Sequence, residues 1–315
     1  MDLRNASMVT EFILLGFSGP WELQVFFFVT FALIYGATLM GNILIIITVT
    51  FSSALRSPMY FLLGNLSFLD LCLSTVTTPK MITDLLAEHR AISLWGCMAQ
   101  MFFMHFFGGA EMTLLITMAF DRYVAICKPL HYRTIMSHRL LRGLVVLSWT
   151  IGFIHTTSQM VLTVNLPFCG HNVIDNIFCD LPLVIKLACI ETYTLELFVI
   201  ADSGLLSLIC FILLLVSYTV ILVTVRQRSS GGLSKALSTL SAHIIVVTLF
   251  FGPCIFIYAW PFKSFSGNKV LAVFYTVITP LLNPLIYTLR NQKMQEAMKK
   301  LQAQHIFKEY ETNHT

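Results

Sequence analysis

The chain has 315 residues, of which 57% are apolar and 11% are charged, and its formal net charge is +4. Soluble globular domains carry about 25% charged residues, so this composition excludes an ordinary soluble fold. It predicts an integral membrane protein.

Seven segments are long and apolar enough to cross a bilayer as helices, which takes about 20 residues each. They are residues 23–49, 59–85, 97–126, 140–166, 197–225, 236–261 and 270–289. They predict one all-α membrane domain, a seven-transmembrane helix bundle. An odd number of spans without an internal repeat argues against a transporter built from paired halves. The motifs of P-loops, zinc proteases and serine hydrolases are absent from the sequence, which argues against an enzyme.

The basic residues predict the orientation of the bundle. If the N-terminus is outside, 14 of the 20 lysines and arginines lie on the cytoplasmic side, as the positive-inside rule requires. No basic region or cleavage site precedes the first span, so we expect an uncleaved signal anchor. Residues 1–22 are then an extracellular N-terminus, 23–289 the membrane domain and 290–315 a cytoplasmic tail. The sequon at Asn5 lies on the outer side and predicts N-glycosylation.

Four of the eight cysteines are expected on the outer, oxidising side of the membrane. Cys97 begins the third span, and Cys169, Cys179 and Cys189 lie in a long loop, about residues 167–194. We expect the disulfides Cys97–Cys179 and Cys169–Cys189. Two such bonds would hold the loop over the outer mouth of the bundle as a lid.

The tail begins with RNQKMQEAMKKLQAQ, residues 290–304, in which Met294, Met298 and Leu301 share one helical face and lysines occupy the other. This pattern favours a short amphipathic helix lying in the inner membrane interface. A disordered basic tail is the alternative.

Charged residues stand out within the apolar spans. The third span ends in MAFDRYVAIC, residues 118–127, which places Asp121 and Arg122 at its inner end. An arginine at the interface must keep a partner or reach water. Asp70 and Glu111 lie near mid-membrane, where a charge costs about 2.5–3.5 kcal/mol on insertion scales. Both should therefore point into the bundle and find a compensating group.

Several motifs together resemble the rhodopsin-like G-protein-coupled receptors, and within them the olfactory receptors. The general features are Cys97 at the top of the third span, DRY at its base, GN in the first span, LSFLD in the second and NPLIY in the seventh. The narrower resemblance lies in PMYFLLGNLSFLDLC, MAFDRYVAICKPLHY, SYTVIL, KALSTLSAHIIVV, TPLLNPLIYTLRN and the loop CGHNVIDNIFCDLPLVIKLAC. These stretches cover nearly the whole chain. The departures, such as Phe120 before DRY, concern the signalling face more than the fold.

The resemblance implies a signalling face at the inner end of the bundle. Arg122 would be held at rest and released when the sixth span moves outward, which opens a cleft for a helix of the G protein. The residues concerned are Asp121, Arg122, Tyr123, Tyr218, Lys235, His243 and Tyr287. The expected partner is the olfactory stimulatory G protein, and the expected result is a rise in cyclic AMP.

The resemblance also places Asn283 beside Asp70 and Glu111. We expect this polar cluster to hold a sodium ion or a shared proton and to link the ligand site to the signalling face. Two protonated acids hydrogen-bonded to each other are the alternative. No other cofactor is expected.

A ligand site is expected above this cluster, between the third, fifth, sixth and seventh spans. The candidate residues are Met101, Met104, His105, Gly108, Gly109, Met112, Asp202, Ser203, Phe256, Tyr258, Trp260, Val273, Thr276 and Thr279. Mostly apolar walls with a few polar groups suit a small volatile odorant, and the two glycines should leave space for it.

Two of these residues have more than one interpretation. Asp202 could accept a hydrogen bond from an alcohol, pair with an amine, or simply face loop water. His105 among methionines could bind copper, but packing methionines and a hydrogen-bonding histidine are favoured, and no metal is expected.

The sequence therefore predicts an odorant receptor in the plasma membrane, whose partners are an odorant, the G protein and the lipid bilayer, with no nucleic acid. A receptor for metabolites outside the nose, or a channel or transporter, are the alternatives.

Overall fold

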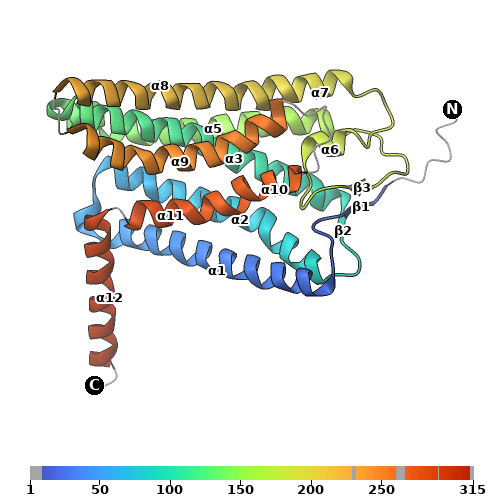
Figure 1. Ribbon diagram of the computed structural model, residues 1–315, viewed down its shortest axis with the longest axis horizontal. Coiled ribbons are helices and arrows are strands. Elements are labelled where there is room, and N and C mark those ends of the chain that lie inside the picture. Colours follow the sequence, from blue (N-terminus) through green and yellow to red (C-terminus); the bar gives the residue numbers. More distant parts are fainter. Residues whose placement is uncertain (1–8, 229–231, 260–266, 290, 313–315) are drawn as a thin grey trace.

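The computed structural model describes residues 9–228, 232–259, 267–289 and 291–312 as a bundle of long helices (Figure 1). Six of them are unbroken: α1 (Trp21–Phe51), α2 (Pro58–Leu86), α3 (Leu94–Cys127), α5 (His138–Thr163), α8 (Leu205–Arg228) and α9 (Gly232–Ala259). The seventh is composed of α10 (Asn268–Val273), the π-helical turn η5 (Phe274–Ile278) and α11 (Thr279–Leu289). A second π-helical turn, η4 (Ile200–Gly204), joins α7 (Tyr193–Val199) to α8.

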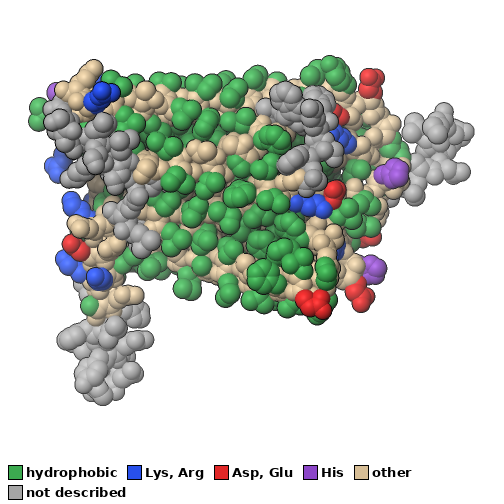
Figure 2. Space-filling model, in the orientation of Figure 1, with side chains coloured by type: hydrophobic (Ala, Val, Ile, Leu, Met, Phe, Trp, Pro, Cys, Tyr) green, Lys and Arg blue, Asp and Glu red, His purple; other side chains and the backbone are tan. Residues whose placement is uncertain are grey.

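The flanks of the bundle are apolar, and the charged side chains collect at its two ends (Figure 2). Among the described residues, six helical segments are long and apolar enough to cross a membrane, and His243–Tyr258 in α9 is a shorter apolar stretch. Large side chains such as Leu33 and Met40 are mostly exposed on the outside, where water would be a poor solvent for them. The chain is a multi-pass membrane protein with the predicted seven-helix architecture.

Helix α3 is the axis of the bundle. Of its most apolar stretch 61% is buried within the protein, against 22% for α1. It packs closely on α5, because a Cβ at Gly152 would lie 2.6 Å from the carbonyl oxygen of Phe106. A Cβ at Gly109 would likewise meet the Cα of Gly152 at 3.2 Å. Small residues thus let the two backbones touch, as is common between membrane helices.

One end of the bundle, called here the disulfide end, is covered by a lid of loop and sheet. Both expected disulfides, Cys97–Cys179 and Cys169–Cys189, are present. The N-terminal segment, for which the sequence suggested no structure, forms strand β1 (Glu11–Leu14). It lies between β2 (Ala91–Ser93), which is antiparallel to it, and β3 (Val173–Ile174), which is parallel. The short helix α6 (Leu181–Ile185) completes the lid.

The other end, called here the Arg122 end, is made of short connections. They are η2 (Ser53–Leu55), η3 (Pro129–His131) and α4 (Tyr132–Ile135). Helix α12 (Gln292–Thr312) then turns away from the bundle axis (Figure 1). Met294 is buried and Met298 half-buried where α12 meets the bundle. The tail is therefore helical, as predicted, and the helix is longer than the expected residues 290–304.

Candidate ligand-binding and signalling sites

A cavity lies between α3, α5, α8, α9 and η5, toward the disulfide end. Its walls are Leu73, Met104, His105, Gly108, Gly109, Met112, His155, Ser203, Ser207, Phe250, Cys254, Tyr258 and Tyr275. The centre of a water molecule can occupy a volume of about 40 Å³ in it. One water needs about 10–15 Å³ by this measure, so the cavity in this conformation has room for only a few. Its walls are mostly apolar, with a few polar groups that converge from different helices.

The cavity brings together seven of the residues that the sequence suggested: Met104, His105, Gly108, Gly109, Met112, Ser203 and Tyr258. The two glycines act differently. A Cβ at Gly108 would meet no atom within 4 Å, so this residue leaves space, whereas Gly109 lets α3 and α5 touch.

Other suggested residues lie elsewhere. Phe256 is 48% exposed on the outside of the bundle, because Cys254 and Tyr258, two residues before and after it, face inward. Its assignment to the pocket is therefore corrected. Met101, Asp202, Val273, Thr276 and Thr279 are not among the residues that line the cavity, and Trp260 lies outside the described residues. The side chains of Thr276 and Thr279 instead donate hydrogen bonds to carbonyls of their own helix.

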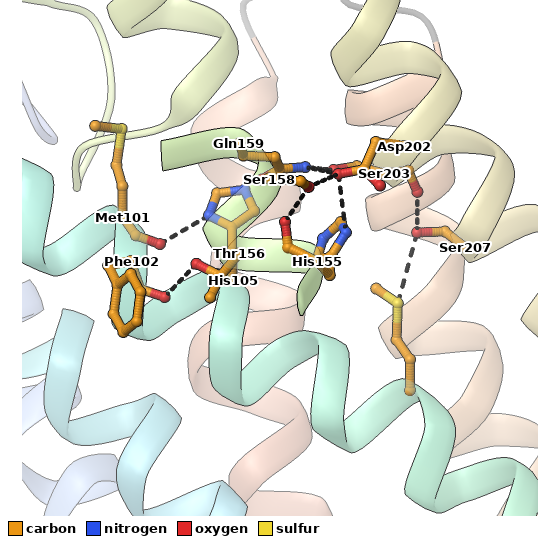
Figure 3. Close-up of polar contacts among 11 residues, drawn as sticks. Met101, Phe102, His105, His155, Thr156, Ser158, Gln159, Asp202, Ser203 and Ser207 are labelled. Atoms are coloured by element: carbon orange, nitrogen blue, oxygen red, sulfur yellow. Dashed lines mark hydrogen bonds and ion pairs between the residues drawn. The ribbon is translucent and has the colours of Figure 1, made fainter. Parts of the chain in front are cut away.

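Asp202 is held by a polar face of α5 (Figure 3). Gln159 Nε2 donates to Asp202 Oδ2 at 2.9 Å, Ser158 Oγ donates to the same oxygen at 3.2 Å, and His155 Nδ1 lies 3.1 Å from it. These contacts occupy the carboxylate with protein partners. All three contacts are made to Oδ2, and the Asp202 side chain remains 24% exposed.

The same network reaches the cavity wall. Gln159 Nε2 also donates to Ser203 Oγ at 2.5 Å, and Ser207 Oγ donates to the carbonyl of Ser203 at 2.7 Å. The sequence analysis missed His155, Ser158 and Gln159. Their spacing of three and four residues places them on one face of α5, which is a signal for a polar face but not for its partner Asp202.

His105 has one occupied and one unoccupied ring nitrogen. Its Nδ1 lies 2.9 Å from the carbonyl oxygen of Met101, and a carbonyl can only accept, so Nδ1 carries the proton. Nε2 is then an acceptor, and it is buried without a hydrogen-bond partner among the described residues. The rings of His155 and Tyr258 lie 6.2 and 5.8 Å away, centre to centre. In Figure 3 the Met101 side chain points away from His105.

The lid is bonded directly to the cavity wall. Tyr258 Oη donates to Asp180 Oδ1 at 3.1 Å, and Asp180 is only 3% exposed. Burial raises the pKa of the Asp180 carboxyl to about 6, and the Tyr258 hydrogen bond opposes part of that rise. The backbone N–H of Cys179 donates to Gln100 Oε1 at 2.9 Å. A change at Tyr258 is therefore felt in the lid.

The expected polar cluster is only partly bonded. Asn283 Nδ2 lies 3.0 Å from each carboxylate oxygen of Asp70. Glu111 is fully buried, and neither of its oxygens has a hydrogen-bond partner among the described residues. The expected alternative, two acids hydrogen-bonded to each other, is therefore not what the structure contains.

At the Arg122 end, the two charges of the DRY sequence have different partners. Tyr132 Oη donates to Asp121 Oδ1 at 2.7 Å, and the guanidinium of Arg122 contacts the sulfur of Met59 in α2. Tyr218 and His243 are buried in the bundle, and Tyr123 is half-buried. The side chains of Lys235 and Tyr287, and the whole of Asn5, lie outside the described part of the chain.

No group of three or more histidine, cysteine, aspartate or glutamate side chains in the described part of the chain is placed to hold a metal ion.

Comparison with known proteins identifies the family. The family model described as "Olfactory receptor" matches residues 31–305. The chain belongs to the olfactory receptor family. Human Olfactory receptor 4L1 is 80% identical over 97% of this chain and 98% of its own length, and human Olfactory receptor 4K3 is 64% identical over 99% and 98%. The protein is thus an odorant-sensing G-protein-coupled receptor of a family that is not enzymatic, and coupling through a G protein to cyclic AMP follows from that family.

Proposed function

We propose that the cavity beside His105 binds a small, mostly apolar odorant that carries one hydrogen-bond donor, such as an alcohol. The observation that carries this proposal is the unpartnered Nε2 of His105 in the wall of a mostly apolar cavity. A buried acceptor without a partner costs about 1–3 kcal/mol, and a ligand hydroxyl would remove that cost. An ether or an ester of the same shape has no proton to donate and would leave it in place.

The small size of the cavity means that binding must widen it. Met104 and Met112 line it, and methionine adapts its shape at little cost because it is unbranched and has three rotatable bonds. Tyr258 forms the α9 side of the wall. A ligand favours the active arrangement only by binding it more tightly than the resting one. Displacement of Tyr258 and α9 supplies such a difference.

The cluster of Asp70, Glu111 and Asn283 lies on the way from the cavity to the Arg122 end. The two unpartnered oxygens of Glu111 suit a sodium ion or a proton shared with Asp70. Replacing external and internal sodium by an organic cation should change the odorant response if the ion is bound. A response indifferent to sodium, and unchanged by Asp70→Asn and Glu111→Gln, would exclude the ion.

The receptor is assigned to the plasma membrane with the disulfide end outside. Fourteen of its 20 lysines and arginines would then be cytoplasmic, in accord with the positive-inside rule. The Arg122 end would contact the olfactory stimulatory G protein and raise cyclic AMP. Helix α12 would lie in the inner interface with Met294 and Met298 toward the bundle.

The test is a panel of straight-chain and terpenoid alcohols, each paired with its methyl ether, applied to cells that report cyclic AMP. Active alcohols should be at least about tenfold more potent than their ethers, the equivalent of one hydrogen bond. His105→Phe should remove this preference. The control is Met101→Leu, a buried α3 residue outside the cavity wall, which should preserve it. Equal potency of alcohols and ethers, or a preference that survives His105→Phe, contradicts the proposal.

A further inference from the structure

Two adjoining hollows open at the Arg122 end, on the side of the bundle formed by α1, η2, α2, α4 and α5. The polar hollow is lined by Ser53, Ala54, Arg56, Ser57, Pro58, Tyr132, Arg133, Met136, Ser137 and His138. The apolar hollow is lined by Val49, Leu55, Arg56, Ser57, Pro58, Phe61, His138, Leu141 and Arg142. The centre of a water molecule can occupy about 540 Å³ of the polar hollow and about 300 Å³ of the apolar hollow. Because they share four residues, they form one continuous groove.

The groove is cationic, and none of the described residues that line it carries a carboxylate. Arg56 and Arg133 are exposed in its wall, and neither has a hydrogen-bond or ion-pair partner in the part of the chain that the structure describes. Arg142 Nε donates to the carbonyl of His138 in its own helix at 3.2 Å, which leaves its terminal nitrogens available. The nearby carboxylate of Asp121 accepts from Tyr132. Three guanidinium groups therefore surround one hollow region without an anion to pair with.

Two helices also begin at this groove. Helix α2 starts at Pro58 and α5 at His138, and their N-cap residues Ser57 and Ser137 both line the polar hollow. The first turn of a helix presents the positive end of the helix dipole. The two helix starts and the arginines all favour an anion at this place. A guanidinium group can bind two oxygens of one phosphate at the same time.

The apolar hollow indicates what kind of molecule carries this anion. Val49 and Phe61 are several residues further into the membrane-spanning parts of α1 and α2 than Arg56 is. Phe61 is 39% exposed there, and Leu141 of α5 completes the wall. A soluble phosphate compound has no apolar part that could fill this half of the groove. An acidic protein surface would not reach into the hydrocarbon region. A phospholipid has a charged headgroup and an apolar chain in this order.

We infer that this groove binds a multiply phosphorylated phospholipid of the inner leaflet, its headgroup phosphates on Arg56 and Arg133 and an acyl chain along Val49 and Phe61. The class that fits is a phosphoinositide, because two or more phosphates match two or more unpaired arginines. Basic pockets between membrane helices on the cytoplasmic side are suited to such headgroups. The site lies at the opposite end of the bundle from the odorant cavity and does not depend on it.

The test uses the purified full-length receptor in uncharged detergent and a fluorescent dioctanoyl phosphatidylinositol bisphosphate. The double variant Arg56→Ala/Arg133→Ala should bind this lipid about 25-fold more weakly, about fivefold for each arginine. Arg139→Ala is the matched control, because Arg139 is an exposed arginine of α5 that follows the groove residue His138 and lines neither hollow. It should bind within about twofold of the original receptor. If the double variant does not yield folded receptor, each single variant is measured for its fivefold effect.

Competitors identify the ligand. Unlabelled dioctanoyl phosphatidylinositol bisphosphate should displace the probe, whereas its free headgroup, inositol trisphosphate, and inorganic phosphate should displace it much less. Phe61→Ala should reduce the difference in displacement between the lipid and its free headgroup, because it removes apolar surface from the half of the groove that binds the acyl chain. Equal displacement by the free headgroup would overturn the lipid in favour of a soluble phosphate compound. Unchanged lipid binding by the double variant, with weaker coupling to purified G protein in lipid-free detergent, would instead assign the arginines to an acidic protein partner.

Discussion

The two ends of the bundle are held together in different ways. At the disulfide end, two covalent bonds, a three-stranded sheet and hydrogen bonds such as that of Arg90 to the carbonyl of Leu15 hold the lid. At the Arg122 end, no disulfide or sheet joins the described elements. They are joined by side-chain contacts such as the hydrogen bond from Tyr132 to Asp121. We therefore expect the disulfide end to keep its shape when the Arg122 end rearranges. A ligand must then be accommodated by side chains in the cavity rather than by movement of the lid.

The largest expected effect concerns the disulfide that joins the lid to α3. The double variant Cys97→Ala/Cys179→Ala removes a disulfide between residues 82 positions apart, which should lower the free energy of unfolding by about 4 kcal/mol. The receptor should then fail to reach the cell surface, measured by antibody against an N-terminal tag. Cys72→Ala, which changes a cysteine outside any disulfide, is the control. Normal surface levels in the double variant would mean that the sheet and the remaining Cys169–Cys189 disulfide are enough to hold the lid.

An intermediate effect is expected at the other end from Tyr132→Phe. The variant removes the hydroxyl that donates to Asp121, and a hydrogen bond to a charged group contributes about 1.5–3 kcal/mol. Backbone hydrogen exchange in residues 128–137 should therefore become faster, while exchange in the lid, residues 167–189, should not change. Tyr123→Phe serves as the control. Faster exchange in both regions would mean that the two ends are not independent.

The smallest effect is a pH dependence of the lid. The pKa of Asp180 is about 6 in the folded protein against an ordinary value of 3.8, so the folded state binds the proton more readily. Acidification from pH 7 to pH 5 should therefore stabilise the closed lid by about 1 kcal/mol. The melting temperature of the receptor should rise accordingly relative to that of Asp180→Asn. If both proteins show the same pH dependence, Asp180 does not titrate in this range.

The fold could be predicted from the sequence because apolar length and basic asymmetry are strong, local signals. The helices begin and end within a few residues of the predicted spans, and both disulfides were expected. The strand β1 was not expected, since its four residues pair with segments about 80 and 160 positions away. No local pattern carries that information.

The candidate site was predicted less completely. Residues of α3 were placed well because one helical face could be extrapolated from Cys97 to Arg122. The contribution of α5 was missed, since its depth relative to Asp202 depends on how the helices pack. The outward direction of Phe256 was missed for a related reason. The position of Phe256 along the sixth span indicates its depth in the membrane, but its direction depends on the rotation of α9 about its own axis.

In the proposed odorant cavity, the contact between Gly109 and Gly152 distinguishes the wall formed by α3 and α5 from the wall formed by α9. With two backbones touching, α3 and α5 form a single stiff frame that carries His105 and His155. Helix α9, which carries Tyr258, faces this frame across the cavity. Changes in the frame should alter which molecules are recognised, and changes in α9 should alter how strongly a recognised molecule activates. Tuning and efficacy can thus diversify separately among close relatives of this receptor.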